Sequence, residues 1–277
     1  MSAQRVRRRT QGQPISTRRA FMQQRAQSVV ARVEVIGRIA QLVWRSAVSL
    51  LTTPLEWRAL LYQMDQLVVR SFGIASATAV FVGIVMSIQF AFTLERFGAK
   101  DTIGRIVGLS EVRELAPSLT ALVVGSRIAA GVAAELGSMM VTEQVDAIRA
   151  LGANPVRKLV VPRLLAVTLG MPMLTAFALV LGVLSAMLIS YTSFGVPMDY
   201  FLQSAINIVK MRDYVSGLGK TPVFGFLVAL IGCFYGLETR GGTEGVGRST
   251  TSAVVVTSVT VLLADAVLTR IFLSVID

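Results

Sequence analysis

The sequence contains no histidine and a single cysteine, Cys233. The absence of histidine excludes His-based catalytic triads and His general bases, and it removes the commonest ligand of protein-bound metals. A lone cysteine excludes an internal disulfide and any metal site built from several cysteines. We therefore expect no metal site in this chain.

Charged residues are also scarce, because they make up 16% of the 277 residues, against roughly 25% in an average soluble domain. Hydrophobic residues make up 53%, and the mean hydropathy is +0.66. This composition predicts a membrane protein rather than a soluble domain.

The few charges are unevenly placed, because residues 1–58 hold eleven arginines and only two glutamates. We predict that residues 1–27 are a disordered basic arm on the cytoplasmic side, near anionic lipid. Nucleic-acid binding is disfavoured, because the arm leads straight into membrane-type sequence. A cleaved signal peptide is not expected, since no compact apolar core with a cleavage site follows the arginines.

Amphipathic sequence and then five long apolar segments follow the arm. Residues 29–66 mix aliphatic side chains with arginines at helical spacing, which is typical of helices lying in the membrane interface. The predicted spans are residues 71–94, 115–140, 164–190, 221–237 and 252–276. The predicted fold is an all-α integral membrane protein. An odd number of spans puts the two termini on opposite sides, so with the basic arm in the cytoplasm the C-terminus lies on the outer side.

A short polar segment, TEQVDAIRALGANPVRK (142–158), separates the second span from the third. Thr142 is a favourable N-cap, Gly152 suits the left-handed position after a helix, and Pro155 prevents continuation. We predict a cytoplasmic helix with an apolar stripe of Val145, Ile148 and Leu151 and with polar residues Glu143, Gln144, Asp146 and Arg149. Such a helix is either a plain connection resting on the interface or a coupling helix seated in a groove of a soluble motor.

A long gapless stretch, residues 110–166, resembles the MlaE/YrbE family of ABC-transporter permeases. It reads SEVRELAPSLTALVVGSRIAAGVAAELGSMMVTEQVDAIRALGANPVRKLVVPRLLA. The family has similar RE, LTALL, AGR, AAELG, TEQ and PR elements in the same order. The downstream stretches GLGKTPVFG and YGLETRGGTEGVGRSTT also look like the family, so the resemblance covers residues 30–277. Ala116 departs from the glycine that is usual there.

The resemblance implies a homodimer in the inner membrane of a double-membraned bacterium, with the C-terminus in the periplasm. It further implies two partners, a cytoplasmic ABC ATPase pair that binds ATP and Mg²⁺ and a periplasmic lipid-binding protein with an MCE domain. The chain itself would be a permease subunit with no catalytic residue and no cofactor. It would move phospholipid or related lipids between the inner membrane and the outer envelope.

The resemblance also implies lipid-binding residues. Arg113 and Glu114 match an Arg-Glu pair close to the family's lipid pocket, and Lys220, read as lying before the fourth span, matches a basic residue near the same cavity. A cation there can meet a lipid phosphate. The alternative for Arg113 and Glu114 is anchoring at the membrane surface. The acyl-chain wall is predicted on the outer half of span one, at Val85, Ile88 and Phe92.

Three more charges, Arg127, Glu135 and Asp265, fall within the predicted spans, where ionisable residues are functional or paired by default. Arg127 and Glu135 can share a broad helix face, which favours a structural pair. We expect Asp265 to find its partner inside the bundle, at Arg127 or Glu135.

Two other functions stay open on the residues alone. An ion-coupled secondary transporter would use Asp265 and Glu135 as coupling carboxylates. An intramembrane lipid-modifying enzyme would need a lysine at membrane depth, but Lys100, Lys158, Lys210 and Lys220 read as loop or interface positions. The stretch GLGKT is not a phosphate loop, because Tyr214 stands where that motif needs its first glycine.

Overall fold

The computed structural model describes residues 34–51 and 56–276, and every regular element among them is helical. The predicted arm, residues 1–27, lies outside the described residues. The chain divides into two compact units, Met1–Arg45 and Ser46–Asp277. Residues 34–51 form a helix, as the amphipathic pattern predicts. All that follows concerns the second unit.

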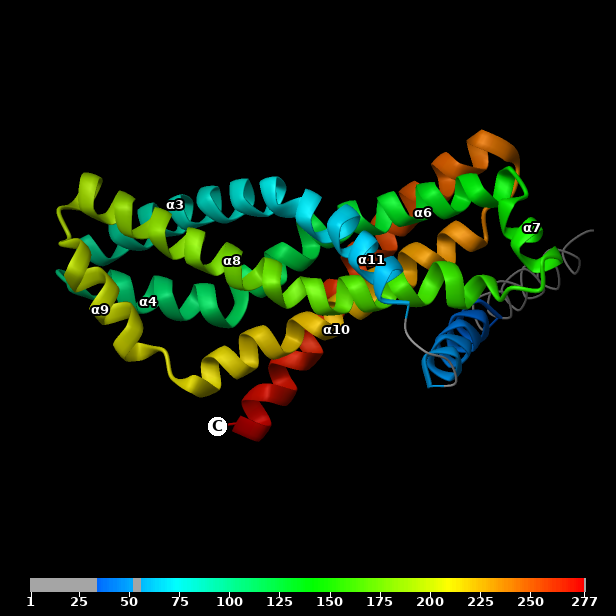
Figure 1. The fold of residues 1–277 in the computed structure, drawn as a ribbon. Helices are drawn as coiled ribbons and strands as arrows, with labels where there is room; N and C mark the ends of the chain where they lie inside the picture. Colours follow the sequence, from blue (N-terminus) through cyan, green and yellow to red (C-terminus); the bar gives the residue numbers. More distant parts are fainter. Residues whose placement is uncertain (1–33, 52–55, 277) are drawn as a thin grey trace, which may run out of the picture. The chain divides into compact units, whose positions relative to one another are not determined.

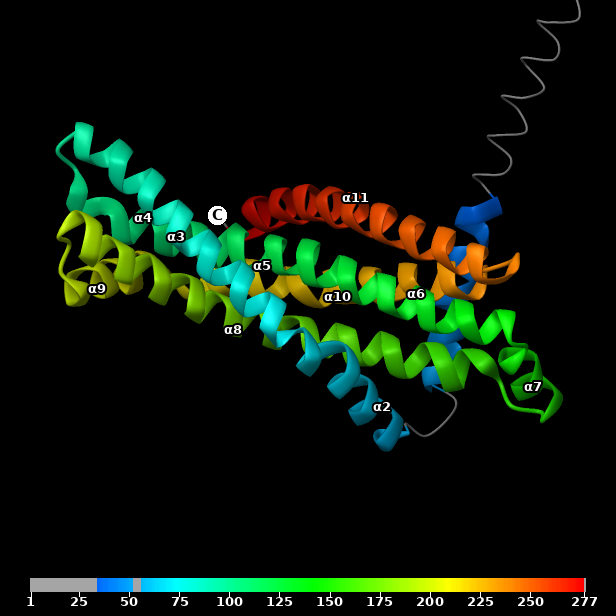
Figure 2. The same cartoon turned by 90° about the horizontal axis from the view of Figure 1, so that it is seen from above.

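Five helical runs in the described residues are long and apolar enough to cross a membrane, which confirms the prediction of an all-α membrane protein. The first two runs form an antiparallel pair joined at Gly98 (Figures 1 and 2). The first contains α2 (Trp57–Gln63), η1 (Met64–Val68), η2 (Val69–Ser71) and α3 (Phe72–Arg96). The second contains η3 (Lys100–Thr102), α4 (Ile103–Ser110), η4 (Glu111–Leu115), α5 (Ala116–Leu119), η5 (Thr120–Val124) and α6 (Gly125–Val141).

A short helix, α7 (Gln144–Ala150), connects this pair to the remaining runs, as Figure 1 shows. The remaining elements are η6 (Val156–Val160), α8 (Val161–Phe194), α9 (Met198–Ile208), α10 (Met211–Leu237) and α11 (Gly242–Ile276). In Figure 1, α7 lies at one end of this unit, and α4 and α9 lie at the other end. The predicted cytoplasmic helix therefore lies at the opposite end of this unit from α4 and α9.

The helices extend beyond the predicted spans at three places. Residues 57–66, expected in the interface, belong to the same helical run as the first span. Residues 95–114, read as a polar stretch, contain α4 and η4, and residues 199–220, read as a loop, contain α9 and the start of α10. The predicted spans are too short at these places because they end where charged residues begin. The helices continue through charged residues, several of which are paired with each other inside the bundle.

Small residues allow the helices to approach closely, as is common in membrane bundles. Where α3 crosses α8, a Cβ atom at Gly83 would collide with the carbonyl group of Gly182. Near this point, the hydroxyl of Ser87 lies 3.0 Å from the carbonyl oxygen of Ala186 and 2.8 Å from the hydroxyl of Ser190. We call this contact, formed by Gly83 and Ser87 of α3 and by Gly182, Ala186 and Ser190 of α8, the α3–α8 seam.

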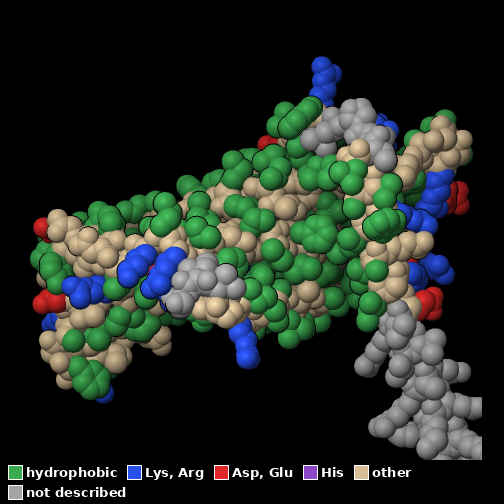
Figure 3. Space-filling model, turned by 90° about the horizontal axis from the view of Figure 1, so that it is seen from below, with side chains coloured by type: hydrophobic (Ala, Val, Ile, Leu, Met, Phe, Trp, Pro, Cys, Tyr) green, Lys and Arg blue, Asp and Glu red, His purple; other side chains and the backbone are tan. Residues whose placement is uncertain are grey.

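The surface agrees with a membrane setting. In Figure 3, hydrophobic side chains cover most of the middle of the face shown, and charged side chains gather mainly towards the two ends. The exposed face of α11 carries a row of large apolar side chains, at Val255, Val259, Leu262, Leu263, Val267 and Ile271.

Candidate functional site

A buried lysine organises the polar interior near the end that carries α9. Lys220 lies inside α10 and is 0% exposed. Its ammonium group donates to the hydroxyl of Thr269 at 2.7 Å and to carboxylate oxygens of Glu114 at 2.9 Å and Asp265 at 3.3 Å. A cation at this depth is stable only because these groups neutralise it and accept its hydrogen bonds.

Arg113 extends the network. Its guanidinium group makes two contacts to one oxygen of Asp213, at 2.8 Å from Nε and 2.6 Å from Nη2. The other oxygen of Asp213 accepts from the backbone N–H of Lys210 at 2.7 Å, which caps the start of α10. We call Arg113, Glu114, Asp213, Lys220 and Asp265 the Lys220 cluster. It joins two cations to three carboxylates.

The cluster changes the interpretation of Lys220. The sequence placed this residue before the fourth span as an open cation, and this is wrong, because α10 starts at Met211 and encloses it. The expected partners of Asp265 are also wrong. Asp265 binds Lys220 and accepts a hydrogen bond of 2.7 Å from Ser118. Of the two cations in the cluster, only Arg113, with a side chain that is partly exposed, keeps some access to an anionic ligand.

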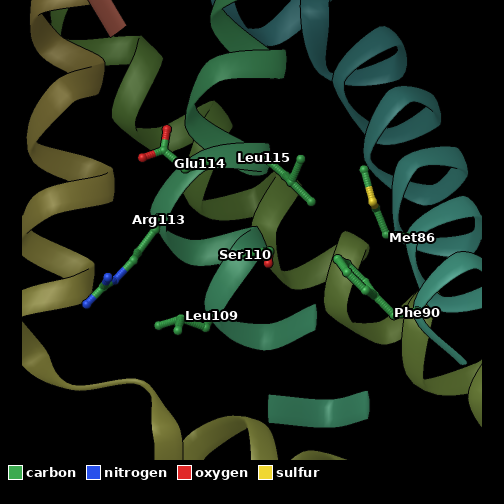
Figure 4. A pocket seen from close by; sticks show the side chains of 7 residues that line it. All are labelled: Met86, Phe90, Leu109, Ser110, Arg113, Glu114 and Leu115. Carbon is green, nitrogen blue, oxygen red and sulfur yellow. The ribbon is translucent and has the colours of Figure 1, made fainter. Parts of the chain in front are cut away.

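A pocket of about 340 Å³ lies beside the cluster. Figure 4 shows Met86 and Phe90 facing it from α3, with Leu115 on the opposite wall. Leu109, Ser110, Arg113 and Glu114 complete the lining, and the last two point away from Met86 and Phe90. The pocket therefore has an apolar wall and a charged edge.

The structure separates the predicted lipid-binding residues into two groups. Arg113 and Glu114 line the pocket, whereas Val85, Ile88 and Phe92 are exposed on another face of α3. Met86 and Phe90 were not among the lining residues predicted from the sequence. The only signal that points to them is their position next to the predicted residues on the same helix.

Arg127 and Glu135 do not form the predicted pair with each other. Glu135 binds Arg163 of α8 at 2.7 Å, and Arg127 donates to the hydroxyl of Ser71 at 2.7 Å. Both residues lie on α6, and neighbouring segments supply nearer partners than α6 itself. Arg163, which is 3% exposed, stands at the edge of a charge-free segment and does not stand out in the sequence as a partner for Glu135.

At the opposite end, α7 has seven residues and is shorter than predicted. The N-cap is Glu143, in a left-handed conformation with φ of 57°, and not Thr142. The hydroxyl of Thr142 instead donates to the carbonyl of Ser138 at 2.9 Å, which ends α6. Gly152 has φ of +76° after α7, which confirms its predicted role.

The predicted apolar stripe on α7 is divided. Val145 is 0% exposed and packs inside this chain, whereas Leu151 is 85% exposed. Among the polar residues, Asp146 and Arg149 bind each other at 2.7 Å on the surface. A partner protein would therefore meet Leu151 and the exposed charges, and not the whole stripe.

Lys158, just after α7, binds Glu56 at 2.6 Å. This hydrogen bond holds the pKa of Glu56 below its ordinary value. The contact ties η6 to the residue that precedes α2.

Comparison with known sequences gives one consistent result. The family described as permease MlaE matches residues 60–271. A probable ABC transporter permease of Synechocystis is 42% identical over 75% of this chain and 79% of its own length. A probable ABC transporter permease of Rickettsia typhi is 35% identical over 82% of this chain and 88% of its own length.

A plant protein is also similar. The chloroplastic protein TRIGALACTOSYLDIACYLGLYCEROL 1 of Arabidopsis thaliana is 39% identical over 79% of this chain. The matched region is 62% of the length of the plant protein, so this chain spans about three-fifths of it.

Proposed function

Because the chain belongs to the MlaE family of ABC-transporter permeases, we propose that it moves phospholipid or a related lipid between the inner membrane and the outer envelope. The chain is a permease subunit and not an enzyme. In this proposal a separate ATPase pair binds ATP and Mg²⁺ and drives transport. The name of the Arabidopsis relative is that of a galactolipid, which favours a lipid as the cargo.

The observation that carries the proposal is the pocket with an apolar wall and a charged edge. Its volume of about 340 Å³ falls in the range of small-molecule sites and suits part of one acyl chain. Each buried methylene contributes about 0.8 kcal/mol, so the apolar wall supplies most of the affinity. The charged edge then positions the polar end of the lipid.

Arg113 is the better of the two predicted phosphate ligands. Arg113 is one of the residues that line the pocket and its side chain is partly exposed, whereas Lys220 is enclosed. A phosphate would compete with Asp213 for the guanidinium group, and the two can share it because Arg offers several donors. Lys220 would then act indirectly, by holding Glu114 in place at the pocket edge.

The remaining partners are part of the same proposal. The ATPase pair would dock at α7, where Leu151 is exposed. A second copy of the chain would pack against the exposed faces of α3 and α11, and a periplasmic MCE-domain protein would receive the lipid at the opposite end from α7. This arrangement places the N-terminus in the cytoplasm and the C-terminus in the periplasm of a bacterium.

Photo-crosslinking tests the pocket. A permease with a photoreactive residue in place of Phe90 is purified with its ATPase, washed in detergent and then irradiated. It should carry covalently captured phospholipid. Phe81, exposed on the same helix but outside the pocket, is the matched control and should lose its lipid in the wash. Equal capture at the two positions, or none at Phe90, would contradict the assignment of the pocket.

The two other functions lose their support. The relatives are named as ABC transporter permeases, and neither as enzymes nor as ion-coupled carriers. In addition, Asp265 and Glu135, the carboxylates that ion coupling would use, are bound to Lys220 and Arg163.

A further inference from the structure

Glu111 is a buried carboxylate that lacks the ion pairs of four other carboxylates in the described spans. Glu114, Glu135, Asp213 and Asp265 each bind a lysine or arginine. Glu111 begins η4, is 2% exposed, and its Oε1 atom is buried without a hydrogen-bond partner. In the part of the chain that the structure covers, no cation lies within salt-bridge distance of it.

The carboxyl group occupies a space that a glycine leaves open in the α3–α8 seam. A Cβ atom at Gly182 of α8 would lie 3.1 Å from Oε2 and 3.3 Å from Oε1 of Glu111. Glu111 also lines a small cavity of about 10 Å³, room for about one water. The cavity's other lining residues are apolar or hydroxyl-bearing: Thr78, Ala79, Val82, Leu115, Ala116, Leu119, Thr120 and Ala178.

The neighbouring stretches of α3, α8, α5 and η5 offer no charge to stabilise a carboxylate. Between Phe72 and Leu94 of α3, and between Leu164 and Phe194 of α8, there is no Asp, Glu, Lys or Arg. The one phenol on that part of α8, Tyr191, is exposed near its far end. α5 and η5 (116–124) carry no charge either.

Among the charges nearest in sequence, Arg105 of α4 is exposed at the surface, and the two on η4 are bound to α10. On η4 itself, Arg113 binds Asp213 of α10, and Glu114 binds Lys220 of α10. An ionised Glu111 would therefore be unpaired at membrane depth, which is a costly state that proteins avoid by neutralising the group.

We propose that Glu111 is a proton-binding site that is neutral while α3 and α8 are packed together and releases its proton when the α3–α8 seam opens. On opening, the O–H bond of the carboxyl breaks, the electron pair stays on the carboxylate, and the proton passes to water. The π-helical turn η4 is suited to such a change, because π-turns frequently mark functional sites where a helix can shift register.

The ligand of this site is a proton, and the inference holds whichever molecule the permease moves. It also differs from ion coupling at Asp265 or Glu135, because those carboxylates are ion-paired with Lys220 and Arg163. High pH would favour the open seam, since the open state binds fewer protons than the packed state.

Infrared spectroscopy tests the proton directly. The full chain in lipid nanodiscs should show the C=O band of a protonated carboxylic acid at neutral pH. Glu111→Gln keeps the size of the side chain and should remove the band. Glu135→Gln is the matched control and should leave it, because Glu135 is held in an ion pair with Arg163. No band in the wild-type chain, or a band that survives in Glu111→Gln, would overturn the proton site.

Spin labels test the link to the seam. Labels at Val85 of α3 and Leu184 of α8, both exposed, report the separation of the two helices in a Cys233→Ala background. In the chain with Glu111, raising the pH should shift the distance distribution to longer values, and in Glu111→Gln the distribution should not respond. A pH-independent distance in both chains, or the same shift in both, would overturn the link.

Discussion

At the scale of single residues, Lys220 shows how charge is tolerated inside this bundle. It is wholly enclosed, and Glu114, Asp265 and Thr269 all accept from its ammonium group. A buried ion pair itself adds little stability, but removing one partner is strongly destabilising. The remaining charge is then left uncompensated in the protein interior. Lys220 should therefore affect folding as well as transport.

Lys220→Met should lower the stability of the purified chain by about 3–5 kcal/mol, because two carboxylates then face each other without a cation. Heating in detergent followed by size-exclusion chromatography measures this as a large fall in the melting temperature. Adding Asp265→Asn and Glu114→Gln to Lys220→Met removes the repulsion and should recover most of the loss. A Lys220→Met chain that melts like the wild type would show that the carboxylates find another partner.

At the scale of elements, α7 combines anchoring and exposure in seven residues. Val145 packs into this chain and fixes the helix, while Leu151 projects from its end. An isolated helix of this length is unstable in water, so its position depends on Val145 and on the left-handed turn at Glu143. The exposed part is then free to meet another protein.

Leu151→Asp should greatly reduce recovery of the ATPase in a pull-down on the permease, because a carboxylate replaces the apolar contact in the docking groove. The chain should still reach the membrane, since the side chain is exposed and makes little internal contact. Phe97→Asp, at an exposed apolar position of the turn between α3 and η3, is the control and should leave the recovery unchanged. Normal ATPase recovery with Leu151→Asp would remove α7 from the docking surface.

At the scale of the whole molecule, the family match begins at residue 60 and covers most of the helical unit that holds the pocket and α7. The basic arm, residues 1–27, precedes that region. Positive charge near a membrane surface contributes about 1 kcal/mol per Lys or Arg to lipid attraction, which is an orienting effect and not a transport step.

Deleting residues 1–27 should leave ATPase recovery and lipid capture at Phe90 unchanged, because both sites lie within the matched region. The pull-down and the photo-crosslink on the truncated chain measure the two properties separately. Loss of either one, with normal amounts of chain in the membrane, would show that the arm takes part in assembly.

The sequence by itself determined the five spans, the position of the short helix between the second and third, and the family, because apolar run length, Gly and Pro placement and a gapless motif are all local properties. It did not determine the partners of the charges. Arg113 meets Asp213, Glu135 meets Arg163, and Lys220 meets Asp265 across different helices. Only the packed bundle decides which side chains become neighbours and that the buried carboxyl of Glu111 meets no cation among the described residues. In a low-dielectric interior, pairing depends on positions a few ångströms apart in space rather than on spacing along the chain.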